Sequence, residues 1–174
     1  MPRGDGPRLR VVADVLRERD SAAGRGLMGS EWAGEAFDWR TELEFVAPDV
    51  TLPPGASAQA IASAEGSLGL TFPKQQVEFL RATDGVYDAE SYRWFAWSLE
   101  RIVDENFEPE RPSDLLLIGD DAASGWFCLR LDHREGVIHY ERTTGERRTI
   151  VPDVRGLWLG WFGGTISVQT AQRR

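Results

Sequence analysis

Two adjacent carboxylates are the first residues in this sequence that could do chemistry. Asp120 and Asp121 stand between two short apolar runs, Leu115 to Ile118 and Trp126 to Leu131, which are typical of neighbouring strands. Paired carboxylates can hold a hard cation, but adjacent strand residues point to opposite faces, and no further oxygen ligands follow at the spacing of a calcium loop. Aspartates in turns also accept hydrogen bonds from their own backbone. We therefore predict a hairpin turn here and no metal site.

Candidates for nucleophilic or acid–base catalysis are few. The chain has two histidines, His133 in an expected turn and His139 in an expected strand, and neither follows the HExxH spacing of metalloproteases. No serine lies in a GxSxG motif, and no glycine-rich loop has the lysine or the preceding strand that phosphate binding needs. The one cysteine, Cys128, is expected to be a buried, inert thiol. We predict no catalytic residue and no cofactor, with structural or solvent-exposed roles for both histidines.

Charge is distributed unevenly along the chain. The protein has 174 residues and a formal net charge of -8 at pH 7. Residues 84–121 contain eleven acidic residues and three arginines, so this segment accounts for the whole imbalance and the rest of the chain is neutral. Phosphate contacts need clustered basic residues, so this composition argues against a nucleic-acid partner.

The acidic segment contains a regular stripe. Glu100, Asp104 and Glu108 follow at intervals of four residues, on the face of an expected helix opposite its apolar positions. Like charges at this spacing cost a helix roughly 0.2–0.5 kcal/mol per pair. The stripe fits either an ordinary solvated face or a surface that attracts a basic partner, and the residues leave both interpretations open.

The elements that must position these residues follow from periodicity and turn-forming residues. Helices are expected in the segments 36–47, 57–68, 73–83, 99–107 and 153–162, and strands in the segments 92–97, 115–119, 126–131, 137–141 and 147–151. In the helix 99–107, the side chains expected to point inward are Leu99, Ile102, Val103 and Phe107. Helices followed by a meander of strands and a last helix indicate an α+β domain. We predict an antiparallel sheet of about four to six strands packed by about four helices.

One domain with two extensions is expected. We assign residues 36–165 to the domain, 1–35 to an N-terminal extension that is partly flexible, and 166–174 to a C-terminal tail. No apolar run is long enough for a signal peptide or a membrane span. We therefore expect a cytoplasmic protein with no membrane partner.

The order of several motifs resembles a known family. The string IASAEGSLGLTFPKQQVEFLRATDGVY is followed by LERIVDEN, then by LLLIGDDAASGWFCLRLD and GVIHYER, and finally by DVRGLWLGWF. Together these segments resemble the SUKH superfamily, the Smi/Knr-type domain. The resemblance implies a non-enzymatic α+β domain that serves in bacterial polymorphic toxin systems as an immunity protein, binding and neutralising a cognate toxin that is often a nuclease. Fungal relatives act as scaffolds in cell-wall signalling.

The acidic segment and the resemblance together suggest where the chain binds its partners. As an immunity protein it would bind a toxin domain as a monomer or weak dimer, through the acidic residues Glu100, Asp104, Glu105, Glu108, Asp120 and Asp121. The family pattern places the I-G-D turn beside a cleft, and we expect a pocket formed by Trp94, Gly119, Ser124 and Trp126. This chain departs from many relatives in having Ser124-Gly125-Trp126 after the turn. The alternative function is a non-catalytic ligand-binding or regulatory scaffold module.

Overall fold

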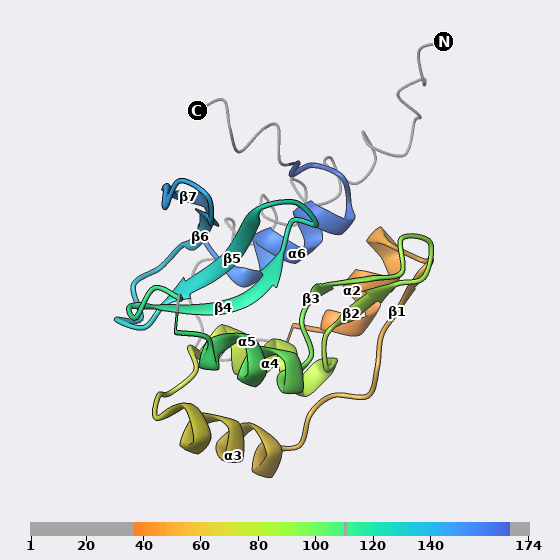
Figure 1. Ribbon diagram of the computed structural model, residues 1–174. Coiled ribbons are helices and arrows are strands. Elements are labelled where there is room, and N and C mark those ends of the chain that lie inside the picture. Colours follow the sequence, from red (N-terminus) through yellow and green to blue (C-terminus); the bar gives the residue numbers. More distant parts are fainter. Residues whose placement is uncertain (1–36, 110, 168–174) are drawn as a thin grey trace, which may run out of the picture. The chain divides into compact units, whose positions relative to one another are not determined.

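The fold was obtained as a computed structural model that describes residues 37–109 and 111–167. Within these residues it contains five helices and seven strands, which makes it an α+β domain (Figure 1). The helices are α2 (Trp39–Val46), α3 (Ala58–Leu68), α4 (Lys74–Ala82), α5 (Leu99–Phe107) and α6 (Val154–Phe162). The strands are β1 (Val50–Thr51), β2 (Val86–Asp88), β3 (Arg93–Ala96), β4 (Leu115–Asp120), β5 (Gly125–Arg130), β6 (Val137–Glu141) and β7 (Arg147–Val151).

The seven strands form one antiparallel sheet in which each strand pairs with its neighbours in sequence, from β1 to β7. The expected α+β class and antiparallel sheet are confirmed, although the strand count is higher than expected. The two strands missing from the expectation are β1 and β2, of two and three residues. The expected hairpin turn between β4 and β5 is present. The N-terminal extension expected at residues 1–35 lies outside the described residues, as does most of the expected tail.

Local sequence signals explain where the helices begin and end. Ser57 caps α3 by accepting a hydrogen bond from the backbone of Ala60, and Gly69 ends it in the left-handed conformation that glycine adopts at little cost. Ser98 caps α5 through Arg101, and Asp84 accepts a hydrogen bond of 2.6 Å from the backbone of Leu99. Asp153 caps α6 through Gly156. These caps fix the helix starts and thus the faces that the helices present.

Aromatic side chains connect the helices to the sheet. Trp39 of α2 packs edge-on against Phe79 of α4, which packs against Trp158 of α6. Trp158 in turn contacts Phe127 of β5. Cys128, the next residue on β5, is buried, as expected, and burial raises the pKa of its thiol.

Helices α5 and α6 lie on opposite faces of β4 (Figure 1). Gly119 faces α6, because a Cβ on this residue would meet the Trp158 ring. Asp120 faces the other way and contacts Arg101 of α5, as the alternation of a strand requires. The turn after Asp120 can therefore supply side chains to both faces of the sheet.

The inward face of α5 differs from the expected one. Leu99, Ile102 and Asn106 are buried, whereas Phe107 is 60% exposed. The expectation that Phe107 points inward was wrong, because the amide of Asn106 occupies the inward position and hydrogen-bonds the backbone of Leu117 on β4. Phe107 is consequently turned toward solvent.

Candidate functional site

The outer face of α5 combines negative charge with an exposed aromatic ring. Glu100, Asp104, Phe107 and Glu108 are all exposed. They share one face because positions 100, 104 and 107 recur at helical spacing and residue 108 caps the helix end. None of the three carboxylates forms an ion pair with a residue that the structure describes. We call these four residues the α5 surface.

Two of the other predicted contact residues share one arginine. Arg101 lies 3.3 Å from a carboxylate oxygen of Glu105 and 3.2 Å from Oδ2 of Asp120. Its guanidinium also stacks on the ring of Trp97, at 4.6 Å from the centroid, and the indole N–H of Trp97 donates to Asp120 over 2.8 Å. Glu105 and Asp120 are thus partly neutralised at the rim of the α5 surface.

Asp121 has a different environment from Asp120. It is 5% exposed, and its Oδ2 lies 2.9 Å from Nε2 of His139, while its Oδ1 accepts hydrogen bonds from the backbone of Ala123 and Gly125. Burial by itself would raise the pKa of Asp121, but the hydrogen bonds from His139 and the two backbone N–H groups outweigh it, and the pKa is lowered. An ionised, buried Asp121 therefore organises the turn and is not placed to touch a partner directly.

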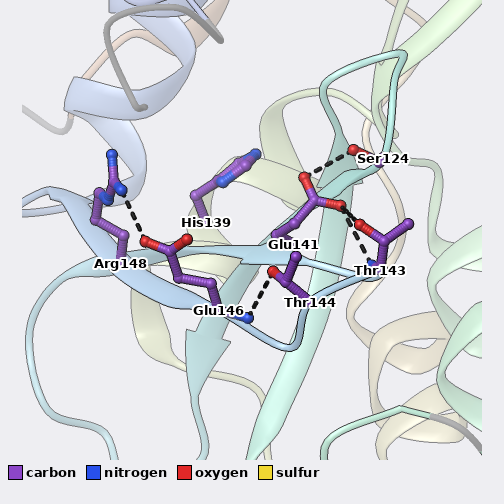
Figure 2. Close-up of a pocket in the computed structure, with 7 residues that line it drawn as sticks. All are labelled: Ser124, His139, Glu141, Thr143, Thr144, Glu146 and Arg148. Carbon is purple, nitrogen blue, oxygen red and sulfur yellow. Dashed lines mark hydrogen bonds and ion pairs between the residues drawn. The ribbon is translucent and has the colours of Figure 1, made fainter. Parts of the chain in front are cut away.

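An open pocket of about 370 Å³ lies on the α6 side of the sheet, at the β6–β7 hairpin. Figure 2 shows His139 between Glu141 and Arg148, with Glu146 and the threonines of the hairpin in front. The residues that line it are Ser124, His139, Glu141, Thr143, Thr144, Glu146 and Arg148.

Hydroxyl groups and a guanidinium hold the carboxylates of this pocket. Ser124 donates to Glu141 over 2.7 Å and Thr143 over 2.8 Å, and these hydrogen bonds lower the pKa of Glu141. Arg148 donates to Glu146 over 2.7 Å. The pocket thus contains two carboxylates, one paired guanidinium and one histidine.

Comparison with known protein families identifies the family of this domain. The sequence profile of the SMI1 / KNR4 family (SUKH-1) matches residues 55–155, from the approach to α3 to the start of α6. The chain belongs to this family. No curated protein matches the chain. The family includes immunity domains of toxin systems, in agreement with the resemblance seen in the motifs.

The four residues expected to form a pocket in this SUKH-1 domain are not brought together. Trp94 packs against Tyr87 of β2, and Gly119 is buried beneath Trp158. Trp126 stacks on Tyr140 at 5.9 Å between ring centroids, on the sheet face opposite Phe127. Of these four residues, only Ser124 lines the pocket at the β6–β7 hairpin.

Six of the seven residues that line this pocket were not predicted from sequence, and His139 and Glu141 are two of them. Alternation along the strand Val137–Glu141 places both on one face, and this signal was available from sequence. The contact between Asp121 and His139 could not be predicted from sequence. These residues are 18 positions apart and meet through the strand register that pairs Phe127 with His139.

Neither a metal-binding cluster nor a membrane-spanning helix is present among the residues that the structure describes. In this part of the SUKH-1 domain, no cluster of three or more His, Cys, Asp or Glu side chains is arranged to hold a metal ion. Across the same residues, no helix has the length and apolar character needed to cross a bilayer.

Proposed function

We propose that this protein is a cytoplasmic immunity protein that binds and neutralises a cognate bacterial toxin domain, and that the α5 surface makes the contact. The observation that carries the proposal is the exposed ring of Phe107 among Glu100, Asp104 and Glu108. A large apolar side chain that is 60% exposed, beside carboxylates without ion pairs among the described residues, has no evident stabilising role in the domain itself.

The two parts of the α5 surface would contribute differently to binding. Unpaired carboxylates of one sign speed the encounter with a basic partner and disfavour acidic ones. An aromatic ring buried in a pocket of the partner supplies most of the affinity, as interface hot spots do. The partner expected from this surface is a basic domain with an apolar recess, such as a nuclease.

The remaining predicted contact residues contribute less to toxin binding in this proposal. Glu105 and Asp120 lie at the rim, where Arg101 offsets their charge. Asp121 is left out because it is buried. The proposed activity is inhibition by occupation, and it requires no bond-breaking by this chain.

The test requires the cognate toxin domain, for which the neighbouring genes are the first place to search. The full chain and the double variant E100K/D104K are compared for protection of cells that express the toxin and for association rate at two salt concentrations. We expect slower association for the variant, with the difference largest at low salt. The control E44K/E135K makes the same change in net charge at two exposed positions away from α5. Equal behaviour of the two double variants would reject the α5 surface as the contact.

A second candidate function is ligand binding by a non-catalytic module. The pocket between Ser124 and Arg148 favours it, because hydrogen bonds within the protein hold the side chains of Ser124, Glu141 and Glu146 in place around it.

A further inference from the structure

The free hydrogen-bonding groups on the hydroxyl and carboxylate side chains of the pocket at the β6–β7 hairpin are mainly acceptors. Ser124 and Thr143 each donate their hydroxyl hydrogen to Glu141, so the lone pairs of both oxygens remain available as acceptors. Glu146 accepts from Arg148 through Oε1, and its Oε2 has no hydrogen-bond partner among the described residues. Three side chains of the lining therefore offer acceptors, and only Thr144 offers a hydroxyl hydrogen.

His139 adds a further acceptor at the base of the pocket. The residue is only 8% exposed, and its Nε2 faces the ionised carboxylate of Asp121 at 2.9 Å. A carboxylate can only accept, so Nε2 is the donor of this hydrogen bond, and in the tautomer that this requires of a neutral ring Nδ1 is the acceptor. No group of the described residues donates to Nδ1. A buried side chain thus brings an unpartnered nitrogen to the pocket.

The charges of the pocket select the sign of a ligand. An anion would meet the carboxylates of Glu141 and Glu146. The one guanidinium of the lining, that of Arg148, is paired with Glu146 through Nη2, and its Nη1 is buried without a hydrogen-bond partner among the described residues. A cationic group with several N–H donors would instead meet acceptors from several directions (Figure 2).

We propose that this pocket binds a guanidinium group, carried either by a small cationic ligand or by an arginine side chain of another protein. Its planar fork of donors suits acceptors spread over three chain segments, the β4–β5 turn, β6 and the β6–β7 hairpin. A volume of about 370 Å³ leaves room for the group together with part of the chain that bears it. The site is distinct from the α5 surface, so either proposal can fail without the other.

The test uses L-argininamide as the probe and the two histidines of the full chain as reporters. Protein labelled with 15N in its histidines is titrated at constant, mildly alkaline pH, and the ring nitrogens are followed by NMR. We expect a saturable shift at His139 and none at His133, which is exposed in the β5–β6 turn. Sodium acetate at equal concentration should leave His139 unchanged. The proposal is overturned if neither histidine responds, if both respond alike, or if acetate moves His139 more than argininamide does.

A pair of charge-neutralising variants locates the binding. Glu146→Gln should weaken argininamide binding by roughly tenfold, because a charge-assisted hydrogen bond is lost and Arg148 is released from its partner. Glu135→Gln removes one charge from an exposed position outside the pocket and should leave the affinity unchanged. Equal affinities for the two variants would contradict the assignment. Far-UV circular dichroism verifies that each variant is folded.

Two further probes separate the sources of the guanidinium. Agmatine carries it on a free chain, whereas acetyl-Gly-Arg-Gly-amide presents it from a peptide backbone. Equal or tighter binding of the tripeptide supports an arginine side chain of a partner, and binding of agmatine alone supports a small cationic ligand. Failure of both probes to shift His139 rejects the proposal.

Discussion

The side-chain amide of Asn106 hydrogen-bonds both backbone polar groups of Leu117. Nδ2 donates to the carbonyl over 2.9 Å, and Oδ1 accepts from the N–H over 3.0 Å. Strand β3 pairs with β4 only where Ala96 faces Gly119, so no strand lies beside Leu117 on that side. The amide of Asn106 takes the place of a peptide group there, and in doing so it fixes the rotation of α5 and the outward position of Phe107.

Replacing Asn106 by alanine should lower the free energy of unfolding by about 2–4 kcal/mol, because two buried backbone groups lose their partner. Urea denaturation followed by tryptophan fluorescence measures the change. Asn106→Asp retains the acceptor for the Leu117 N–H but loses both amide donations, and it should also be strongly destabilised. A loss below about 1 kcal/mol in the alanine variant would mean that the backbone finds other partners.

Phe107→Ala should leave the unfolding free energy within about 0.5 kcal/mol of the parent, because the ring is 60% exposed. Its affinity for the toxin domain should fall at least tenfold, mostly through faster dissociation. Surface plasmon resonance separates the two rate constants.

The matched control for this ring is Phe45→Ala on α2, where the side chain is 58% exposed. Loss of an equally exposed ring at that position should leave affinity unchanged. If both alanine variants bind as the parent does, Phe107 is not an anchor of the interface.

Much of the scaffold followed from sequence, and the reasons are local. The helix at Leu99–Phe107 and the strands at Val137–Glu141 and Arg147–Val151 were predicted with the bounds that the structure has. Each is delimited by a cap or a turn within a few residues. Strands β1 and β2 escaped prediction because two or three residues do not establish an alternating pattern.

The orientation of side chains within these elements depended on distant partners. By hydrophobicity alone Phe107 belongs inside and Asn106 outside, and the reverse holds because the partner of Asn106 is on another element. Asp120 and Asp121 were assigned alike from sequence. Strand alternation and register place Asp120 against Arg101 and Asp121 against His139.

The buried Asp121 should make stability fall at acid pH. Its pKa in the folded protein is lowered below the unfolded value of about 3.9, so the unfolded state binds the proton more tightly. The stabilisation is therefore present above the unfolded pKa and is lost as pH falls from about 5 through the folded pKa. Thermal melts at a series of pH values record the loss.

Asp121→Asn should be less stable than the parent at neutral pH and should lose less stability on acidification. Asp88→Asn is the control, because Asp88 also has a lowered pKa, through its hydrogen bond with Ser91, but lies at an exposed turn. Parallel acid profiles for the parent and Asp121→Asn would show that Asp121 carries no such stabilisation.

Gly125→Ala should disrupt the contact between Asp121 and His139. A Cβ at position 125 would collide with Nε2 of His139 and come within 2.5 Å of Oδ2 of Asp121. These atoms belong to buried side chains, so they cannot move aside freely, and we expect a loss of about 1–3 kcal/mol. The 15N shifts of His139 should change while those of His133 do not.

Gly66→Ala provides the matched control, because Gly66 lies in α3 and a Cβ there would meet no atom within 4 Å. In a helix interior the same substitution should raise the unfolding free energy by about 0.5–1 kcal/mol. The two alanine variants should therefore differ in sign. If Gly125→Ala is as stable as the parent, the turn can accommodate a Cβ at this position. The close contact between Asp121 and His139 would then not be needed for the stability of the turn.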